Sequence, residues 1–80
     1  NGTFILVNEG QATLDLTDFE VLVNGVLLEQ EDVGALVLGH SDSQLVFFGD
    51  RVLFQTGADL EGSRVTVITS LGSTTTYDPN

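Results

Sequence analysis

The chain has 80 residues, of which 41% are hydrophobic, and a net charge of −10 that sets 12 carboxylates against Arg51 and Arg64. This length predicts a single domain over residues 1–80. The acidic surface excludes nucleic acid as a partner, because such binding needs Lys or Arg to neutralise phosphates. The chain has no cysteine, so no disulfide supports the core and no thiolate is available to hold zinc.

Short apolar runs separated by turn residues fill the first half of the chain and predict strands. They cover Thr3–Asn8, Gln11–Leu16, Phe19–Val23 and Val26–Leu28. In the second of these runs apolar side chains alternate with polar ones, which is the period of a half-buried strand. Asn24-Gly25 stands between the last two runs and predicts a hairpin, because both central positions of a type I′ turn need positive φ.

The second half continues in the same way after the polar segment Glu29–Asp32, which we expect to be a solvated loop. Strands are predicted at Ala35–Leu38, Gln44–Phe48, Arg51–Thr56, Arg64–Ser70 and Thr74–Tyr77. A hairpin through Leu71-Gly72-Ser73 should join the last two. No window repeats apolar residues at helical spacing, so the pattern predicts an all-β fold, an antiparallel β-sandwich of seven to nine short strands.

The only histidine gives no sign of a catalytic site. His40 lies between Gly39 and Ser41, with Asp42 next along the chain. A nucleophilic triad needs its hydroxyl, base and carboxylate to converge from separate elements, whereas neighbours on one loop point apart. We therefore interpret this segment as a loop, and we expect no catalytic residue and no enzymatic activity.

The carboxylates do not predict a metal site or a cofactor. Asp15–Asp18 and Glu29–Asp32 are the densest acidic segments, but both lack the spaced Asp/Asn pattern and central Gly of a calcium loop. We expect Asp18 to cap the turn that precedes the third strand. Glu20 and Glu29 flank the Asn-Gly hairpin without an accompanying sugar-stacking Trp, and so are interpreted as a solvated face.

Apolar residues are more numerous than one inner face of each strand requires. If Phe19 and Val21 face inward, Leu22 faces outward, and the same alternation leaves Leu53 and Ile68 on outer faces. The candidate interface residues are therefore Leu22, Leu53, Ile68 and Ile5, with Val7 as the alternative in the first strand. Several such residues on one sheet would mark a contact surface, whereas bulges or register changes would bury them instead.

Four segments carry a resemblance to a known family. They are Gly2–Gly10 (GTFILVNEG), Leu14–Gly25 (LDLTDFEVLVNG), Gly49–Gln55 (GDRVLFQ) and Ser63–Thr69 (SRVTVIT). Together they resemble the soluble domain of archaeal flagellar accessory proteins, the archaellum stator proteins, which are related to archaellin and archaeal pilin β-sandwich domains. The resemblance implies an immunoglobulin-like sandwich outside the cytoplasm, at the cell surface or in the pseudo-periplasm. It also implies a preceding hydrophobic helix as membrane anchor, and no catalytic residues.

The resulting hypothesis is a non-enzymatic, extracytoplasmic interaction module of the archaellum motor, acting as an anchoring or self-assembling stator component. Expected partners are a second copy of the chain or another cell-surface protein, such as the S-layer protein. No stretch approaches the roughly 20 apolar residues of a membrane span, so this segment itself should not contact the membrane. Two alternatives remain, a pilin or archaellin filament head domain and a ligand-binding β-sandwich of a larger secreted protein.

Overall fold

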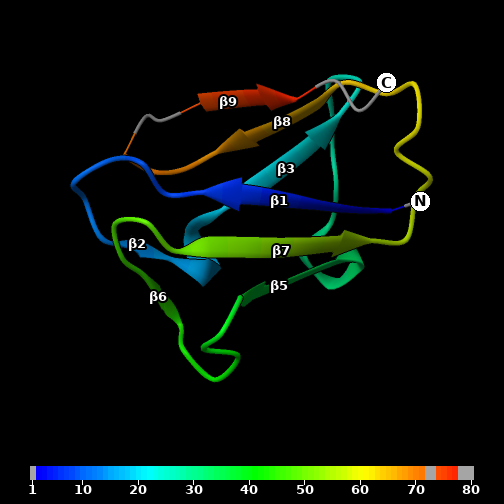
Figure 1. The fold of residues 1–80 in the computed structure, drawn as a ribbon. Coiled ribbons are helices and arrows are strands. Elements are labelled where there is room, and N and C mark those ends of the chain that lie inside the picture. The colour runs from blue at the N-terminus through cyan, green and yellow to red at the C-terminus, as the bar shows by residue number, and fades with distance from the viewer. Residues whose placement is uncertain (1, 72–73, 78–80) are drawn as a thin grey trace.

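The computed structural model describes residues 2–71 and 74–77, and for residues 74–77 it describes the backbone alone. Nine strands and two short 3₁₀ helices follow one another along this part of the chain (Figure 1). The strands are β1 Thr3–Val7, β2 Leu14–Asp15, β3 Glu20–Val23, β4 Val26–Leu27, β5 Val33–Val37, β6 Leu45–Val46, β7 Arg51–Thr56, β8 Val65–Ile68 and β9 Thr74–Tyr77. The helices are η1 Leu16–Asp18 and η2 Gln30–Asp32, and none in the described part is long and apolar enough to cross a membrane.

The strands of the described residues form three sheets, and every pairing between them is antiparallel. One sheet has the order β1-β7-β5, another has the order β4-β3-β8-β9, and the third consists of β2 and β6. In Figure 1, β1 passes in front of β3, so the two larger sheets lie at different depths. The predicted all-β fold is confirmed, whereas its immunoglobulin-like sandwich arrangement stays a prediction.

The Asn24-Gly25 hairpin has the predicted geometry. Asn24 has φ 52° and Gly25 has φ 82°, and Val23 pairs with Val26 across the turn. The Asn24 side chain also joins this turn to the start of β8, because its Oδ1 accepts a hydrogen bond from the Arg64 amide at 2.9 Å. The predicted hairpin through residues 71–73 extends beyond the described residues, although β8 and β9 do pair antiparallel.

The expectation that Asp18 caps the turn into the third strand is wrong, because Asp15 does so. The Asp15 side chain accepts a hydrogen bond from the Thr17 amide at 2.9 Å, which ends β2 early and starts η1. The Asp18 carboxylate instead accepts hydrogen bonds from the amide and hydroxyl of Ser70, at 3.1 and 2.6 Å. Asp18 therefore links the end of η1 to the segment that follows β8.

One hydrophobic core joins the two larger sheets, and Phe54 of β7 lies at its centre. The Phe54 ring stacks on Phe4 of β1 with centroids 4.9 Å apart, and it meets the edge of Phe19, just before β3, at 5.3 Å. The remaining buried hydrophobic residues are Val21, Val37, Val46, Val52, Leu60, Val65 and Val67. Alternation along the strands puts Val21, Val52, Val65 and Val67 on inner faces, as the sequence predicts, whereas Leu60 enters the core from the loop between β7 and β8.

Replacing Phe54 should therefore damage the whole fold. We expect Phe54→Ala to lower the free energy of unfolding by about 3–5 kcal/mol, since it removes two ring contacts and leaves a cavity. The measurement is urea denaturation followed by circular dichroism. The control is Phe48→Ala, whose parent side chain is 70% exposed and should change stability by less than about 0.5 kcal/mol. Equal losses in the two variants would contradict this account of the core.

Candidate interaction surface

Two of the four predicted interface residues lie side by side on the outer face of the β1-β7-β5 sheet. Ile5 of β1 stands opposite Leu53 of β7, and Leu53 in turn stands opposite Leu36 of β5. Ile5 is 53% exposed, while Leu53 and Leu36 are half-buried. These three side chains form an apolar row across all three strands. The outer face of this sheet is therefore apolar, as the faces of sheets that pack against a second layer usually are.

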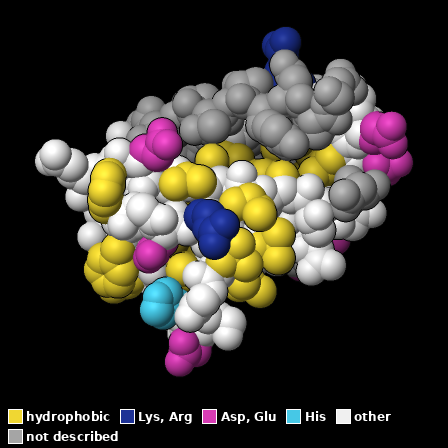
Figure 2. Space-filling view, in the orientation of Figure 1, with side chains coloured by type: hydrophobic (Ala, Val, Ile, Leu, Met, Phe, Trp, Pro, Cys, Tyr) yellow, Lys and Arg dark blue, Asp and Glu magenta, His cyan; other side chains and the backbone are white. Residues whose placement is uncertain are grey.

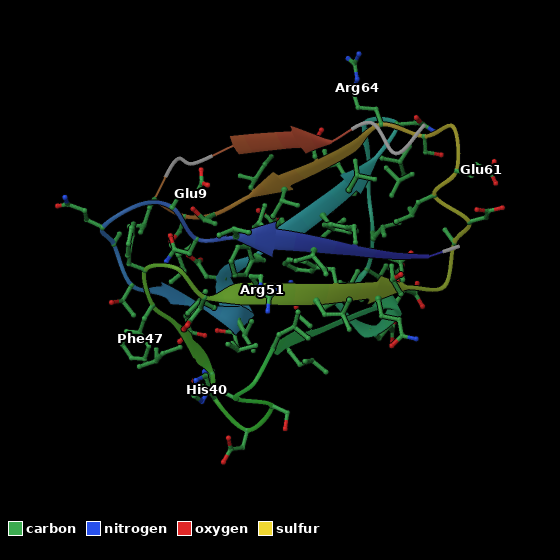
Figure 3. All side chains as sticks on the ribbon, in the orientation of Figure 1. Glu9, His40, Phe47, Arg51, Glu61 and Arg64 are labelled. Atoms are coloured by element: carbon green, nitrogen blue, oxygen red, sulfur yellow. The ribbon has the colours of Figure 1, made fainter. Side chains whose placement is uncertain are left out.

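A second row continues this surface around a positive charge. Val7 of β1 stands opposite Arg51 of β7, and the Leu38 amide donates a hydrogen bond to the Arg51 carbonyl at 2.8 Å. Figure 2 shows hydrophobic side chains gathered around one dark-blue side chain, which Figure 3 labels as Arg51. We call this surface the β7 face: Ile5, Val7, Leu36, Leu38, Arg51 and Leu53.

The other two predicted interface residues lie on a different sheet. Leu22 of β3 stands opposite Leu27 of β4, which is 54% exposed, and Ile68 of β8 stands opposite Glu20. Both Leu22 and Ile68 are half-buried. The four predicted residues therefore divide into two pairs on separate sheets, Ile5 with Leu53 and Leu22 with Ile68.

An aromatic turn lies at the end of the β1–β7 ladder, where the sequence predicts a turn at Gly49-Asp50 but places Phe47 and Phe48 in the preceding strand. The predicted strand Gln44–Phe48 ends at Val46, and Phe47 and Phe48 are 52% and 70% exposed. Phe47 and Asp50 close the turn, because the Asp50 amide donates to the Phe47 carbonyl and the Phe47 amide donates to Asp50 Oδ2. Gly49, with φ 85°, supplies the positive φ that such a turn requires, and Gly49-Asp50 was the available sequence signal.

Asn8 fixes this turn to the end of β1. Its amide donates to the Asp50 carbonyl at 2.9 Å, and its carbonyl accepts from the Gly49 amide at 2.8 Å. Its side-chain nitrogen donates to the carbonyls of Ala12 and Val46, both at 3.0 Å. Asn8 is 6% exposed, so these bonds form in a setting where an unpaired group would be costly. The aromatic turn is therefore held firmly beside the β7 face.

A surface cavity of about 240 Å³ lies between the end of β1, β2 and the end of β8. Its polar lining includes Asn8, Glu9 and Thr69. The Asn8 side chain is already occupied by hydrogen bonds. The Thr69 hydroxyl has no partner among the described residues, but its oxygen is closed to solvent, so a molecule in the cavity would not reach it. The Asn8 amide nitrogen and the Thr69 hydroxyl are therefore not available to a ligand in this cavity.

The side chains considered for catalysis or sugar binding lie at the surface. His40, Asp42, Glu20 and Glu29 are exposed, and Figure 3 shows His40 on the loop that precedes β6. No group of three or more His, Cys, Asp or Glu side chains that could hold a metal ion occurs in the described part of the chain. These positions offer solvated side chains, in contrast to the apolar β7 face.

The surroundings of the Asp15 carboxylate favour its charged form. Hydrogen bonds from the side chain and the amide of Thr17, and then one from the Gln44 side chain, lower the pKa of Asp15 below its ordinary value. Asp15 Oδ1 accepts from Thr17 Oγ1 at 2.7 Å and from Gln44 Nε2 at 3.2 Å. The contact with Gln44 also holds η1 against the segment that enters β6.

Comparisons with protein-family models, with curated proteins and with solved structures find no match for this chain. The β7 face and the aromatic turn must therefore be interpreted from their own chemistry.

The lowered pKa of Asp15 predicts a pH dependence of stability. A carboxyl whose pKa is lower in the folded state stabilises the fold at neutral pH, and that contribution is lost as the pH falls below about 4. We expect the urea midpoint of Asp15→Asn to lie below that of the parent at pH 7, and the difference to shrink as the pH falls through the lowered pKa of Asp15. The Thr17→Ala variant, which keeps the carboxylate but removes a donor, should show a smaller difference. A gap that stays constant with pH would contradict the assigned cause.

Proposed function

We propose that this chain is a non-enzymatic interaction module of the archaellum motor, an extracytoplasmic stator component that binds partners through its β7 face. The observation that supports the proposal is the apolar row of Ile5, Leu53 and Leu36 on an otherwise strongly acidic chain. The assignment to the archaellum motor comes from the resemblance of the sequence to the stator proteins. The β7 face is the surface through which we expect the contact to form.

The position of the β7 face argues for binding rather than for chance exposure. Scattered exposed apolar residues are ordinary, but contiguous ones on one face of a sheet are typical of contact sites. Here Ile5, Val7 and Leu53 adjoin one another in the strand register, and Val7 is 43% exposed. A partner that covers them would remove apolar surface from water, which is the main driving force of protein association.

The charges of the chain suggest how such binding is regulated. Twelve carboxylates and a net charge of −10 make copies of this chain repel one another and any acidic partner at low salt. Arg51 lies within the apolar surface, where a partner carboxylate could pair with it. Because salt screens charge repulsion but not apolar contact, association through this face should strengthen as salt increases.

The immunoglobulin-like sandwich belongs to the same proposal. Its support is that side chains from the β1-β7-β5 sheet and the β4-β3-β8-β9 sheet share one core, through the contacts of Phe54 with Phe4 and Phe19. In a sandwich of this kind the outer faces of the sheets are free for partners. The β7 face is such an outer face.

The test is a pair of variants in motile cells that encode this chain at full length. Leu53→Glu places a charge in the middle of the β7 face, whereas Gln55→Glu adds the same charge two residues away on the same side of β7. We expect Leu53→Glu cells to assemble filaments but to lose at least half of their swimming speed, and Gln55→Glu cells to swim normally. Urea denaturation of both purified variants checks that each remains folded.

Two results would contradict the proposal. One is normal swimming of the Leu53→Glu cells. The other is recovery of the chain from purified filaments in amounts comparable to the main filament subunit, which would indicate a filament head domain instead of a stator component.

A further inference from the structure

The Asn24-Gly25 turn between β3 and β4 places a chemically reactive pair of residues at the surface. Asparagine is a labile residue, and a following glycine favours loss of its side-chain amide, because glycine has no side chain to shield its nitrogen. Both residues are exposed. Apart from its neighbours in the chain, no atom lies within 4 Å of the place that a Cβ on Gly25 would occupy. Water therefore reaches this turn freely.

The reaction needs only these two residues and water. The backbone nitrogen of Gly25 attacks Cγ of Asn24, and a new C–N bond closes a succinimide ring. The side-chain nitrogen of Asn24 leaves as ammonia and takes the proton of the Gly25 nitrogen with it. Water then adds to one of the two ring carbonyls and breaks its bond to the ring nitrogen, which regains a proton. The product is aspartate or isoaspartate at position 24, without oxidation or reduction.

The folded chain directs the Asn24 side chain away from this ring closure. Asn24 Oδ1 accepts a hydrogen bond from the Arg64 amide at 2.9 Å, and Asn24 Nδ2 donates one to Ser63 Oγ at 3.3 Å. Both partners lie just before β8, so the side-chain amide points across to that segment instead of along its own backbone toward Gly25. The Asn24 amide also donates to the Arg64 carbonyl at 2.8 Å, which fixes the backbone of the turn.

We infer that Asn24 is a site of spontaneous deamidation that reacts only when the β3–β4 turn separates from the segment before β8. Such an opening breaks the hydrogen bonds that join Asn24 to Ser63 and Arg64 and leaves the core around Phe54 packed. Local openings of this kind occur in folded proteins without global unfolding, especially where the hydrogen bonds are exposed to solvent. The rate of modification at Asn24 therefore follows how often this contact opens.

The two products have different consequences for the sheet. Aspartate retains an oxygen that can accept from the Arg64 amide, and like asparagine it tolerates positive φ, so the turn can form again. Isoaspartate routes the main chain through the former side chain and lengthens it by one carbon. The tight turn that pairs Val23 with Val26 cannot accommodate this extra atom. Isoaspartate at position 24 thus releases β4 from the edge of its sheet, and the change is irreversible.

The test compares rates of deamidation in mildly alkaline buffer for the full-length chain, folded and unfolded in urea. Digestion of each sample after Glu20 and Glu29 yields the peptide 21–29, in which Asn24 is the only amide side chain, so mass spectrometry assigns the product. We expect the folded parent to react at least tenfold more slowly than the unfolded parent. Asn24→Asp should keep the circular dichroism of the parent, because its turn can form.

Two serine variants test the cause of the protection. Ser63→Ala removes the acceptor of Asn24 Nδ2 and should raise the rate in the folded chain about threefold. The matched control is Ser43→Ala, which removes a hydroxyl that bonds to Leu45 on another loop and should react like the parent.

Hydrogen exchange tests the consequence. The Leu28 amide donates to the Val21 carbonyl at 2.9 Å in the folded chain, so it should exchange faster in chains that contain isoaspartate. Equal rates in the folded and the unfolded parent, or in the two serine variants, would overturn the inference. Unchanged exchange at Leu28 would overturn the release of β4. None of these results bears on the stator proposal, which depends on the swimming of Leu53→Glu cells.

Discussion

The structure depends on strand β7, which is hydrogen-bonded on both sides and apolar on both faces. Its inner side chains include Phe54, whose ring stacks on Phe4 of the same sheet and meets Phe19, directly before β3 of the other large sheet. Its outer side chains include Leu53, which β1 and β5 flank with Ile5 and Leu36. A strand alternates its side chains between two faces, so a central strand with apolar residues on both faces contributes to one core and leaves a second apolar surface without a cover.

Size and charge explain why such a surface is useful to this chain. A domain of 80 residues buries a modest share of its surface and has no cysteine to cross-link it. Burial of the β7 face by a partner would add apolar contacts that the isolated chain cannot make for itself. The net charge of −10 opposes indiscriminate aggregation through the same residues, which leaves specific pairing as the productive outcome.

The side chains that hold the turns at the ends of the sheets are polar. Asn8 binds the aromatic turn to the end of β1, and Asp15 starts the 3₁₀ turn that follows β2. Both side chains satisfy backbone groups that the short strands leave open. The sheets therefore end abruptly, and the exposed Phe47 and Phe48 are held in a tight turn instead of continuing β6.

Much of this fold was predictable from local patterns, because the information lies within a few residues. Alternating apolar residues located all nine strands in order, and Asn24-Gly25 located its hairpin, since positive φ at both positions is a local requirement. The burial of Val52 and Phe54 and the outward direction of Leu53 followed from the same alternation. Strand ends were less accurate, because Asp15 accepts from the Thr17 amide and ends β2 early, whereas Asp18 accepts from Ser70, a donor that only the folded chain brings within reach.

The candidate surface was predicted only in part. The sequence by itself determined that Ile5, Leu22, Leu53 and Ile68 are surplus apolar residues, because that depends on the period of a single strand. Which of them meet was decided by the pairing of strands far apart in the chain. The register of β1 and β5 on β7 joined Ile5 and Leu53 to Leu36, and left Leu22 and Ile68 on the other sheet. Only tertiary structure settles such pairings, because they depend on which strands share a core.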